Sequence, residues 1–281
     1  MIKEIKKLKN NNLDYSNLND NNLSIQLSVD GFSFCIYNKI HNKIGAFGVY
    51  EFENSTGSPF QHLESVKQLF TQEELLQNNY KSVFVTHFNN LVTQVPLPLF
   101  NKNSLANYLQ YTVKVLENDF IAYDEINNSE IINVYIPFVN INNFLLDTYD
   151  TFVYKHSSTV LIENLLNQYK NLEGNFCFVN VTRRYFEIVV IKNKKLELFN
   201  FFNFTCKEDF IYYILFTAEQ LNLNPEEFEL ILMGDIEKES ELYKIVYQYI
   251  RNVKFYSPSD TTLQLDGIAS HSNFTLLNQF K

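Results

Sequence analysis

The sequence predicts an α/β protein of two lobes, each with a mixed β-sheet flanked by helices. Apolar residues make up 46% of the 281 residues, with 26 Phe and 18 Tyr, against only 7 Gly and 6 Pro, which is typical of a densely packed globular chain. Short apolar or β-branched runs alternate with segments of helical periodicity. The order meander, helix, strand, helix, strand occurs twice, which indicates an internal duplication.

The first copy opens with three predicted strands, at 23–29, 32–37 and 44–52. Asp30-Gly31 separates the first two, and this pair favours the positive φ values of a tight hairpin. We therefore expect an antiparallel meander. The rest of the first copy is predicted as an apolar-striped helix over 63–70, a polar helix near 72–77, strands at 82–87, 91–95 and 131–138, and a long helix over 101–118.

The second copy is predicted from about residue 140. Strands at 175–181, 185–192 and 195–204, joined by short polar turns, repeat the meander. The strand at 195–204 is apolar on both faces, which favours a sheet covered by helices on both sides. The flanking elements are a strand at 153–155, a helix after it with Ser157 or Ser158 as N-cap, helices at 206–221 and 239–250, and strands at 229–233 and 253–256.

The two ends of the chain lie outside the repeats. The start is rich in Lys and Asn and weakly patterned, so we expect a flexible arm, with a basic helix that binds a membrane surface or a partner as the alternative. Near the end, Phe274, Leu277 and Phe280 stand at helical spacing and predict a helix that packs back on the first lobe. The expected divisions are an arm over 1–22, a first lobe over 23–139, a second lobe over 140–258 and a tail over 259–281.

Charge and apolar runs exclude several function classes. The chain has 23 Lys and Arg against 32 Asp and Glu, a net charge of -9, which argues against a nucleic-acid partner because phosphate binding depends on basic residues. No apolar run approaches the roughly 20 residues of a membrane span. The start lacks the apolar region of a secretory signal. We therefore expect a cytoplasmic protein.

Cysteine and histidine spacing offers no local metal site. The thiols of Cys35, Cys177 and Cys206 are far apart and set among apolar neighbours, as expected of reduced core thiols in the cytosol. The five histidines lack the short spacings of metal-binding pairs. The sequence therefore predicts no metal ion held by these residues.

Two halves of meander and helices in tandem resemble the actin-like ATPase superfamily, whose lobes have a ribonuclease H-like fold. Three segments carry a closer resemblance: Leu-Ser-Val-Asp-Gly-Phe-Ser-Phe at 27–34, Leu-Val-Thr-Gln-Val-Pro-Leu-Pro-Leu-Phe at 91–100, and His-Ser-Asn-Phe-Thr-Leu-Leu-Asn-Gln-Phe at 271–280. They look like the bacterial family called domain of unknown function 3822 (DUF3822). That resemblance implies a duplicated actin-like fold and brings no established activity with it.

The superfamily resemblance implies that ATP would lie between the lobes, with the first hairpin turn of each lobe around the phosphates. In the first turn, Asp30 and Gly31 match the pattern in part, and Phe32 stands where the backbone must approach phosphate. Asp30 could hold a water bound to Mg²⁺, and Ser33 a phosphate oxygen. The alternative is that Asp-Gly only makes the turn.

The second turn and the adenosine turn depart further from the superfamily pattern. Asn180, Thr182 and Arg183 supply neither the carboxylate nor the glycine that the second turn needs, so no group there orients water or Mg²⁺. Arg183 could bind an anion or could be an exposed turn charge. Gly234-Asp235 resembles the adenosine turn with Asp235 in place of a second glycine, and it also suits an ordinary strand-to-helix connection.

These departures predict a non-catalytic actin-like protein with a degenerate nucleotide site that binds or scaffolds a protein partner. Under this hypothesis there is no catalytic residue and no cofactor. The alternative is an ATP-dependent phosphotransferase or ATPase that uses ATP and Mg²⁺, with Asp30 as metal ligand and Asp235 in place of the lost carboxylate. A homodimer also fits the duplication.

Overall fold

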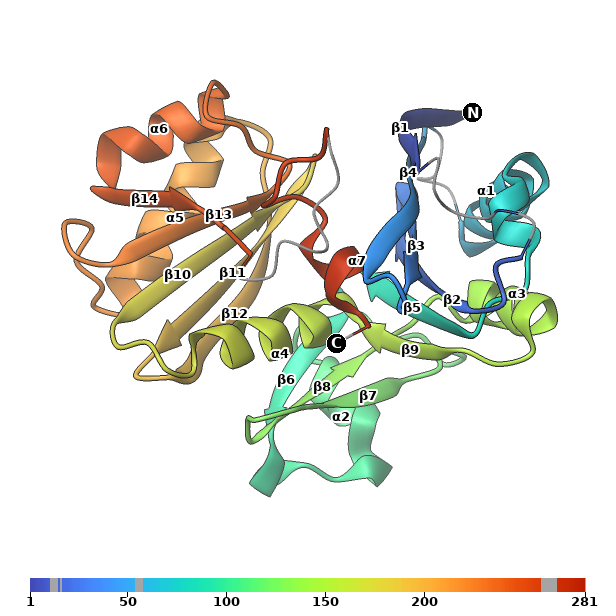
Figure 1. Ribbon diagram of the computed structural model, residues 1–281. Coiled ribbons are helices and arrows are strands. Elements are labelled where there is room, and N and C mark those ends of the chain that lie inside the picture. The colour runs from blue at the N-terminus through green and yellow to red at the C-terminus, as the bar shows by residue number, and fades with distance from the viewer. Residues whose placement is uncertain (11–14, 16, 54–57, 259–266, 281) are drawn as a thin grey trace. The chain divides into compact units, whose positions relative to one another are not determined.

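The computed structural model describes residues 1–10, 15, 17–53, 58–258 and 267–280. The chain forms two compact units, one of Met1–Leu161 with Thr275–Lys281 and one of Ile162–Phe274. Each unit has a main β-sheet of parallel and antiparallel strands with helices beside it (Figure 1), as the sequence predicted. The division after Leu161 differs from the predicted division at 139/140, because the strand before the connecting helix belongs to the first sheet.

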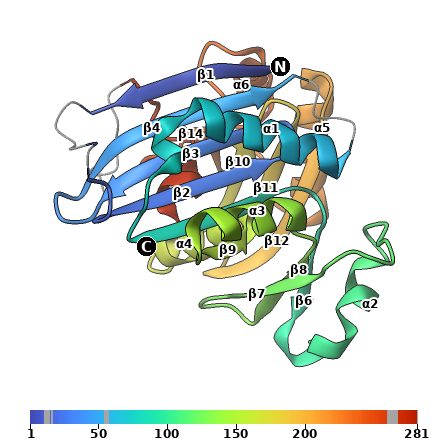
Figure 2. The same cartoon turned by 90° about the vertical axis from the view of Figure 1, so that its right-hand side faces the viewer.

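The main sheet of the first unit has six strands in the order β1-β4-β3-β2-β5-β9. Figure 2 shows β1, β4, β3 and β2 side by side. The strands β2, β3 and β4 form the predicted antiparallel meander, and β5 and β9 extend it in parallel from β2. Their bounds are β1 Ile2–Lys9, β2 Asn21–Ser28, β3 Gly31–Asn38, β4 Lys43–Phe52, β5 Ser82–Phe88 and β9 Val153–His156.

Strand β1 lies in the region for which the sequence predicted a flexible arm or a helix, and that prediction is wrong for residues 2–9. The strand pairs antiparallel with β4 along its length. Ile2 packs against the core of the unit. Lys7 forms an ion pair with the buried carboxylate of Glu73, which also accepts a hydrogen bond of 2.7 Å from Tyr50 Oη. The Lys-rich pattern concealed a strand because lysine stems can cover apolar surface while the charges stay in water.

Helices and a terminal segment pack on this sheet. Helix α1 is capped by Ser58, whose Oγ accepts a 3.2 Å hydrogen bond from Gln61 N, and it has a proline in its first turn. Its stripe of Val66, Leu69 and Phe70 is buried in the core, as the periodicity predicted. The other helical elements of this layer are the 3-10 helix η1 Glu74–Gln77, α3 Val139–Tyr149 and α7 Phe274–Asn278, after α1 Pro59–Gln72.

The tail helix α7 reaches the first unit through backbone and ring contacts. Ser24 Oγ donates a 2.7 Å hydrogen bond to Leu276 O. The ring of Phe280 lies 4.9 Å from that of Tyr37 and 5.9 Å from that of Phe84. These contacts explain why the last residues belong to the first unit.

A second, three-stranded sheet in the first unit has the antiparallel order β6-β8-β7. The predicted helix over 101–118 is wrong, because only a short 3-10 helix, η3, and a five-residue α-helix, α2, form there. Asn101 Oδ1 accepts a 3.0 Å hydrogen bond from Asn103 N, and Asp119 Oδ2 accepts a 2.7 Å bond from Leu116 N, so local side-chain bonds replace helical ones. The bounds are β6 Val92–Pro96, η2 Leu97–Leu99, η3 Lys102–Ser104, α2 Leu105–Leu109, β7 Ala122–Ile126 and β8 Ile131–Tyr135.

The second unit has a five-stranded sheet in the order β12-β11-β10-β13-β14. The meander β10 to β12 is antiparallel, and β13 and β14 continue it in parallel. Strands β10 and β11 cover the predicted residues. The bounds are α4 Ser157–Tyr169, which begins in the first unit, β10 Asn175–Val181, β11 Tyr185–Lys192, β12 Lys195–Asn203, α5 Lys207–Gln220, β13 Glu229–Gly234, α6 Glu241–Tyr249 and β14 Asn252–Phe255.

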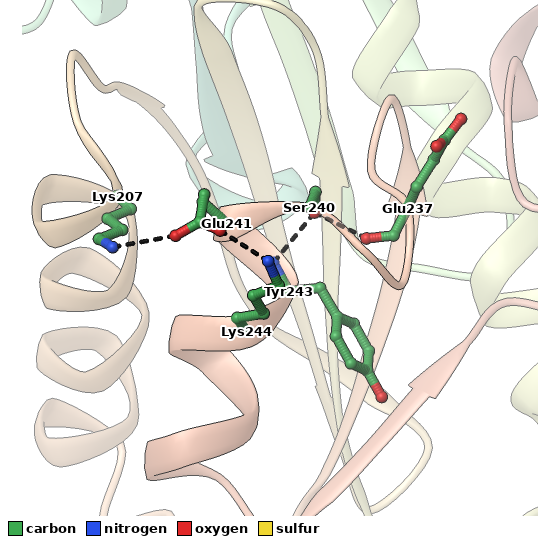
Figure 3. Close-up of polar contacts among 6 residues, drawn as sticks. All are labelled: Lys207, Glu237, Ser240, Glu241, Tyr243 and Lys244. Carbon is green, nitrogen blue, oxygen red and sulfur yellow. Dashed lines mark hydrogen bonds and ion pairs between the residues drawn. The ribbon is translucent and has the colours of Figure 1, made fainter.

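The start of α6 shows how a local cap sets a helix boundary (Figure 3). Ser240 Oγ accepts a 3.2 Å hydrogen bond from Tyr243 N, so the helix begins at Glu241 rather than at the predicted residue 239. The Glu241 carboxylate lies 3.1 Å from Lys207 Nζ on α5 and 2.7 Å from Lys244 Nζ. An acidic side chain in the first turn also interacts favourably with the helix dipole.

One face of the second sheet packs on α5 and α6 around Val179, Phe186, Phe210 and Ile214, which are all buried. In the described part of the chain, no helix is long and apolar enough to span a membrane.

Candidate functional site

The first hairpin turn joins β2 to β3 in the first unit and carries Asp30. The Asp30 carbonyl accepts a 2.9 Å hydrogen bond from Phe52 N, and its carboxylate accepts a 3.1 Å bond from Ser28 Oγ. A Cβ on Gly31 would lie 2.9 Å from Tyr50 O. Glycine is therefore needed here because β4 approaches the turn closely.

The side chains that follow Gly31 alternate across the sheet. Phe32 is buried in the core, where its ring meets that of Phe70 edge-on at 5.9 Å. Ser33 lies on the opposite face and is half-buried. The expectation that the Phe32 side chain would stand in the way of a phosphate is therefore wrong, because the side chain leaves the turn on the core side.

His62 on α1 lies near this turn, and sequence reasoning missed it. Its ring packs edge-on against Phe52 and Phe138, with centroids 6.0 and 4.9 Å away. Burial lowers the pKa of His62 to about 4, opposed by the Ser28 carbonyl and the Asp30 charge. The imidazole is thus neutral at pH 7. The signal was its place one turn before Val66 on the buried stripe of α1.

The second hairpin turn, in the second unit, holds a buried polar pair. Asn180 on β10 and Glu187 on β11 are register partners, and Asn180 Nδ2 donates a 2.8 Å hydrogen bond to Glu187 Oε2. Burial raises the pKa of Glu187 to about 7, with the Asn180 bond acting in the opposite direction. Glu187 Oε1 has no hydrogen-bond partner among the described residues. Sequence reasoning missed this carboxylate, although a glutamate inside an apolar strand was the signal.

Thr182 closes the second turn, and Arg183 lies at its tip. Thr182 N and Oγ1 both donate to Tyr185 O, at 2.8 and 3.0 Å. The side chain of Arg183 is exposed. The hydroxyl of Thr182 is therefore engaged in the hairpin.

Gly234 ends β13 beside this turn. Its φ is +80°, and a Cβ there would lie 2.0 Å from Val181 O. Gly234 N donates to His271 O at 2.8 Å, and Asp235 N donates to Val181 O at 2.7 Å. The second unit thus brings Asn180, Gly234 and Asp235 together at one end of β10 and β13.

A larger buried polar network lies in the first unit, away from both turns. The Asp124 carboxylate accepts hydrogen bonds from Tyr135 Oη, His156 N and Thr159 Oγ1 at 3.0, 2.8 and 2.7 Å. The His156 ring bonds instead to Ser158 Oγ and to a main-chain carbonyl, at 2.7 and 3.1 Å.

The chemistry of this network is structural. Burial lowers the pKa of His156 to about 3, and burial raises that of Asp124. The aspartate touches the histidine backbone rather than its ring, so the relay of a nucleophilic triad is missing. The network links β7 to β9 and α4. Within the described residues, no three His, Cys, Asp or Glu side chains form a group that could hold a metal ion.

Comparison with known proteins identifies the family. A family profile described as protein of unknown function (DUF3822) matches residues 10–253. The chain belongs to the DUF3822 family. A comparison with curated proteins found no match.

Two solved structures place the fold of this DUF3822 chain. A Bacteroides thetaiotaomicron protein with an actin-like ATPase fold and unknown function has a TM-score of 0.76 and 25% identity, covering 89% of this chain and 96% of its own. A chain of the PilM-PilN type IV pilus biogenesis complex has a TM-score of 0.62 and 10% identity, covering 92% and 96%. The predicted actin-like fold is thereby confirmed.

Proposed function

We propose that this DUF3822 chain is a non-catalytic actin-like protein that binds a protein partner, with a nucleotide site that no longer hydrolyses ATP. The Asn180–Glu187 pair is the observation that carries the proposal. Phosphoryl transfer depends on charges that are positioned and fixed. In the second turn the amide of Asn180 is tied to Glu187, a buried carboxylate with a pKa of about 7.

The partner-binding half of the proposal draws support from the PilM-PilN complex, whose fold is similar. The likeness concerns the fold, so it supports a class of function and no particular partner. We also propose a cytoplasmic location, because Cys35, Cys177 and Cys206 are all free thiols.

The alternative function is an ATPase or phosphotransferase. Its support is Asp30, which is half-buried at a hairpin tip, together with Asp235 beside Gly234. In that mechanism Asp30 would hold Mg²⁺ through water, and turnover would depend on its carboxylate.

Nucleotide binding and turnover separate the two functions. Thermal unfolding is measured with Mg-ATP, with Mg-ADP and without nucleotide, beside phosphate release. A ligand at a hundredfold excess over its Kd stabilises the native state by about 2.7 kcal/mol. We expect no phosphate release in any condition, and no effect of Asp30→Ala on partner binding.

The matched control is Asp147→Ala, which removes an exposed carboxylate from α3. Phosphate release by the wild type that disappears in Asp30→Ala and persists in Asp147→Ala, with both variants folded, would establish the enzyme instead.

A further inference from the structure

The small sheet of the first unit is only partly covered by its helix. Helix α2 packs against β6 and β8, with Leu109 in contact with the buried face of Val95 and Val134. The strand register places Tyr123 and Glu125 of β7 on that same face. Both side chains are exposed. The helix therefore leaves the β7 side of this face open.

An aromatic cluster lines the uncovered side. The Phe100 ring lies 5.0 Å from that of Tyr123 and stacks on that of Tyr108 at 6.1 Å. Tyr108 Oη donates to Leu99 O at 2.7 Å and accepts from Asn101 N at 2.8 Å, so the loop before α2 is held in place. We name Leu99, Phe100, Tyr108 and Tyr123 the β7 face.

The β7 face and the segment around it expose several large apolar side chains. Leu99 is 70% exposed and Tyr123 41%. Four further large apolar side chains between residues 97 and 120 are also exposed, namely Leu97, Tyr111, Leu116 and Phe120. Soluble monomers seldom leave large contiguous apolar patches uncovered, and such patches mark interaction sites. Rigid aromatic anchors are the side chains that dominate binding energy.

The charges around the β7 face indicate which partner it fits. From Leu116 to Glu130 the sequence holds five acidic residues and no Lys or Arg. The segment from Leu97 to Val115 adds two exposed lysines, Lys102 and Lys114, so acidic residues still outnumber basic ones. Asp124 is in the buried network, while Glu117, Glu125 and Glu130 are exposed. A partner with Lys or Arg beside its apolar anchors complements this rim, whereas a second copy would bring like charges together.

The spacing of the layers favours a helical partner. Strands lie about 4.8 Å apart and packed helices about 8–10 Å apart. A helix beside α2, which covers β6 and β8, therefore lies over β7. We propose that the β7 face binds a basic amphipathic helix of a partner protein, which completes the helical layer over the small sheet. This inference rests on the partner-binding function proposed above.

The test uses the full chain and two labelled peptides of about 18 residues, long enough to form a helix. Both peptides carry Leu at the same helical spacing, and their polar positions are all Lys in one and all Glu in the other. Fluorescence anisotropy is expected to show binding of the Lys peptide at least about tenfold tighter than of the Glu peptide.

Variants assign the binding to the β7 face. We expect Tyr123→Glu and Leu99→Asp each to weaken binding of the Lys peptide about tenfold or more. Tyr123→Ser should also weaken binding, with less risk to folding. Glu125→Lys should weaken it as well. The matched controls are Tyr247→Glu on α6 and Glu219→Lys on α5, which make the same changes at exposed positions and should leave binding unchanged.

Several outcomes would overturn the inference: no binding of either peptide, equal binding of both, or equal losses in the controls. A dimer in light scattering that Leu99→Asp dissociates would assign the face to a second copy. A native partner whose binding survives Tyr123→Glu and Leu99→Asp would overturn this surface and leave the proposed function standing. ATP turnover that depends on Asp30, with peptide binding intact, would overturn the proposed function and leave this surface standing.

Discussion

The first hairpin turns of the two units have the same backbone plan and different polar chemistry. In each, the first strand of the hairpin also pairs with a parallel strand, β2 with β5 and β10 with β13. The first turn keeps the half-buried carboxylate of Asp30 at its tip. The second turn has its carboxylate, Glu187, buried on a strand. The backbone geometry of a turn and the placement of its carboxylate are therefore separable in this fold, because hydrogen bonds set the first and side-chain burial sets the second.

Acid should destabilise the first unit more than the second, and this is the largest effect we expect. Burial lowers the pKa of His62 to about 4 and those of His87 and His156 to about 3. These groups stay neutral in the folded unit, while the unfolded chain takes up protons below about pH 6.5. Stability therefore falls as the pH drops below that value, by about 2 kcal/mol per histidine at pH 5 and about 6 kcal/mol for three.

Amide hydrogen exchange at pH 7 and pH 5 measures the stability of each unit separately, once the intrinsic exchange rates are corrected with unfolded peptides. His87→Phe should reduce the loss in the first unit, and the exposed His41→Gln should leave it unchanged. Equal losses of protection in both units would contradict the prediction.

The glycines at the two turns should differ in what they tolerate. Gly234→Ala places a Cβ 2.0 Å from a carbonyl at a φ of +80°, whereas Gly31→Ala places one 2.9 Å from a carbonyl without a positive φ. We expect a loss of about 4 kcal/mol for the first change and about 1–2 kcal/mol for the second. Urea unfolding of both variants measures the difference, and equal losses would show that the backbone at β13 can shift.

How much the sequence could predict differs between the units for physical reasons. Apolar runs bounded by polar turns predicted β10 and β11 correctly, because the sequence pattern is local and the two strands pair with each other across a short turn. The helix predicted over 101–118 failed because local side-chain bonds compete with helical ones, as where Asp119 takes the Leu116 N–H. Strand β1 was missed because it depends on pairing with β4, some 40 residues away, which the local periodicity of the sequence does not reveal.

In the candidate site too, local features could be predicted from the sequence and features that depend on tertiary burial could not. The close backbone approach at Gly234 could be predicted, because a glycine at the end of an apolar strand indicates one, while its place in a nucleotide site stays a prediction. The role of Glu187 could not, because its pKa depends on burial and on Asn180 across the strand pair. His62 shows the same limit, since its neutral state follows from the rings of Phe52 and Phe138.

Replacing the carboxylate of each turn by an amide should distinguish the two turns, through an effect smaller than that of Gly234→Ala. Because folding raises the pKa of Glu187 from 4.5 to about 7, its stability contribution is present below about pH 4.5 and is lost as the pH rises through 7. Glu187→Gln removes that loss, keeps an acceptor for Asn180 and should stabilise the second unit by about 3 kcal/mol at pH 8, with no change at pH 4.5. Asp30→Asn, at a half-buried turn, should change stability by less than about 0.5 kcal/mol at either pH. Urea unfolding at the two pH values measures both variants. A Glu187→Gln protein that is less stable at pH 8 would mean that the carboxylate is ionised and held by a cation or donor, and the two turns would then share the same chemistry.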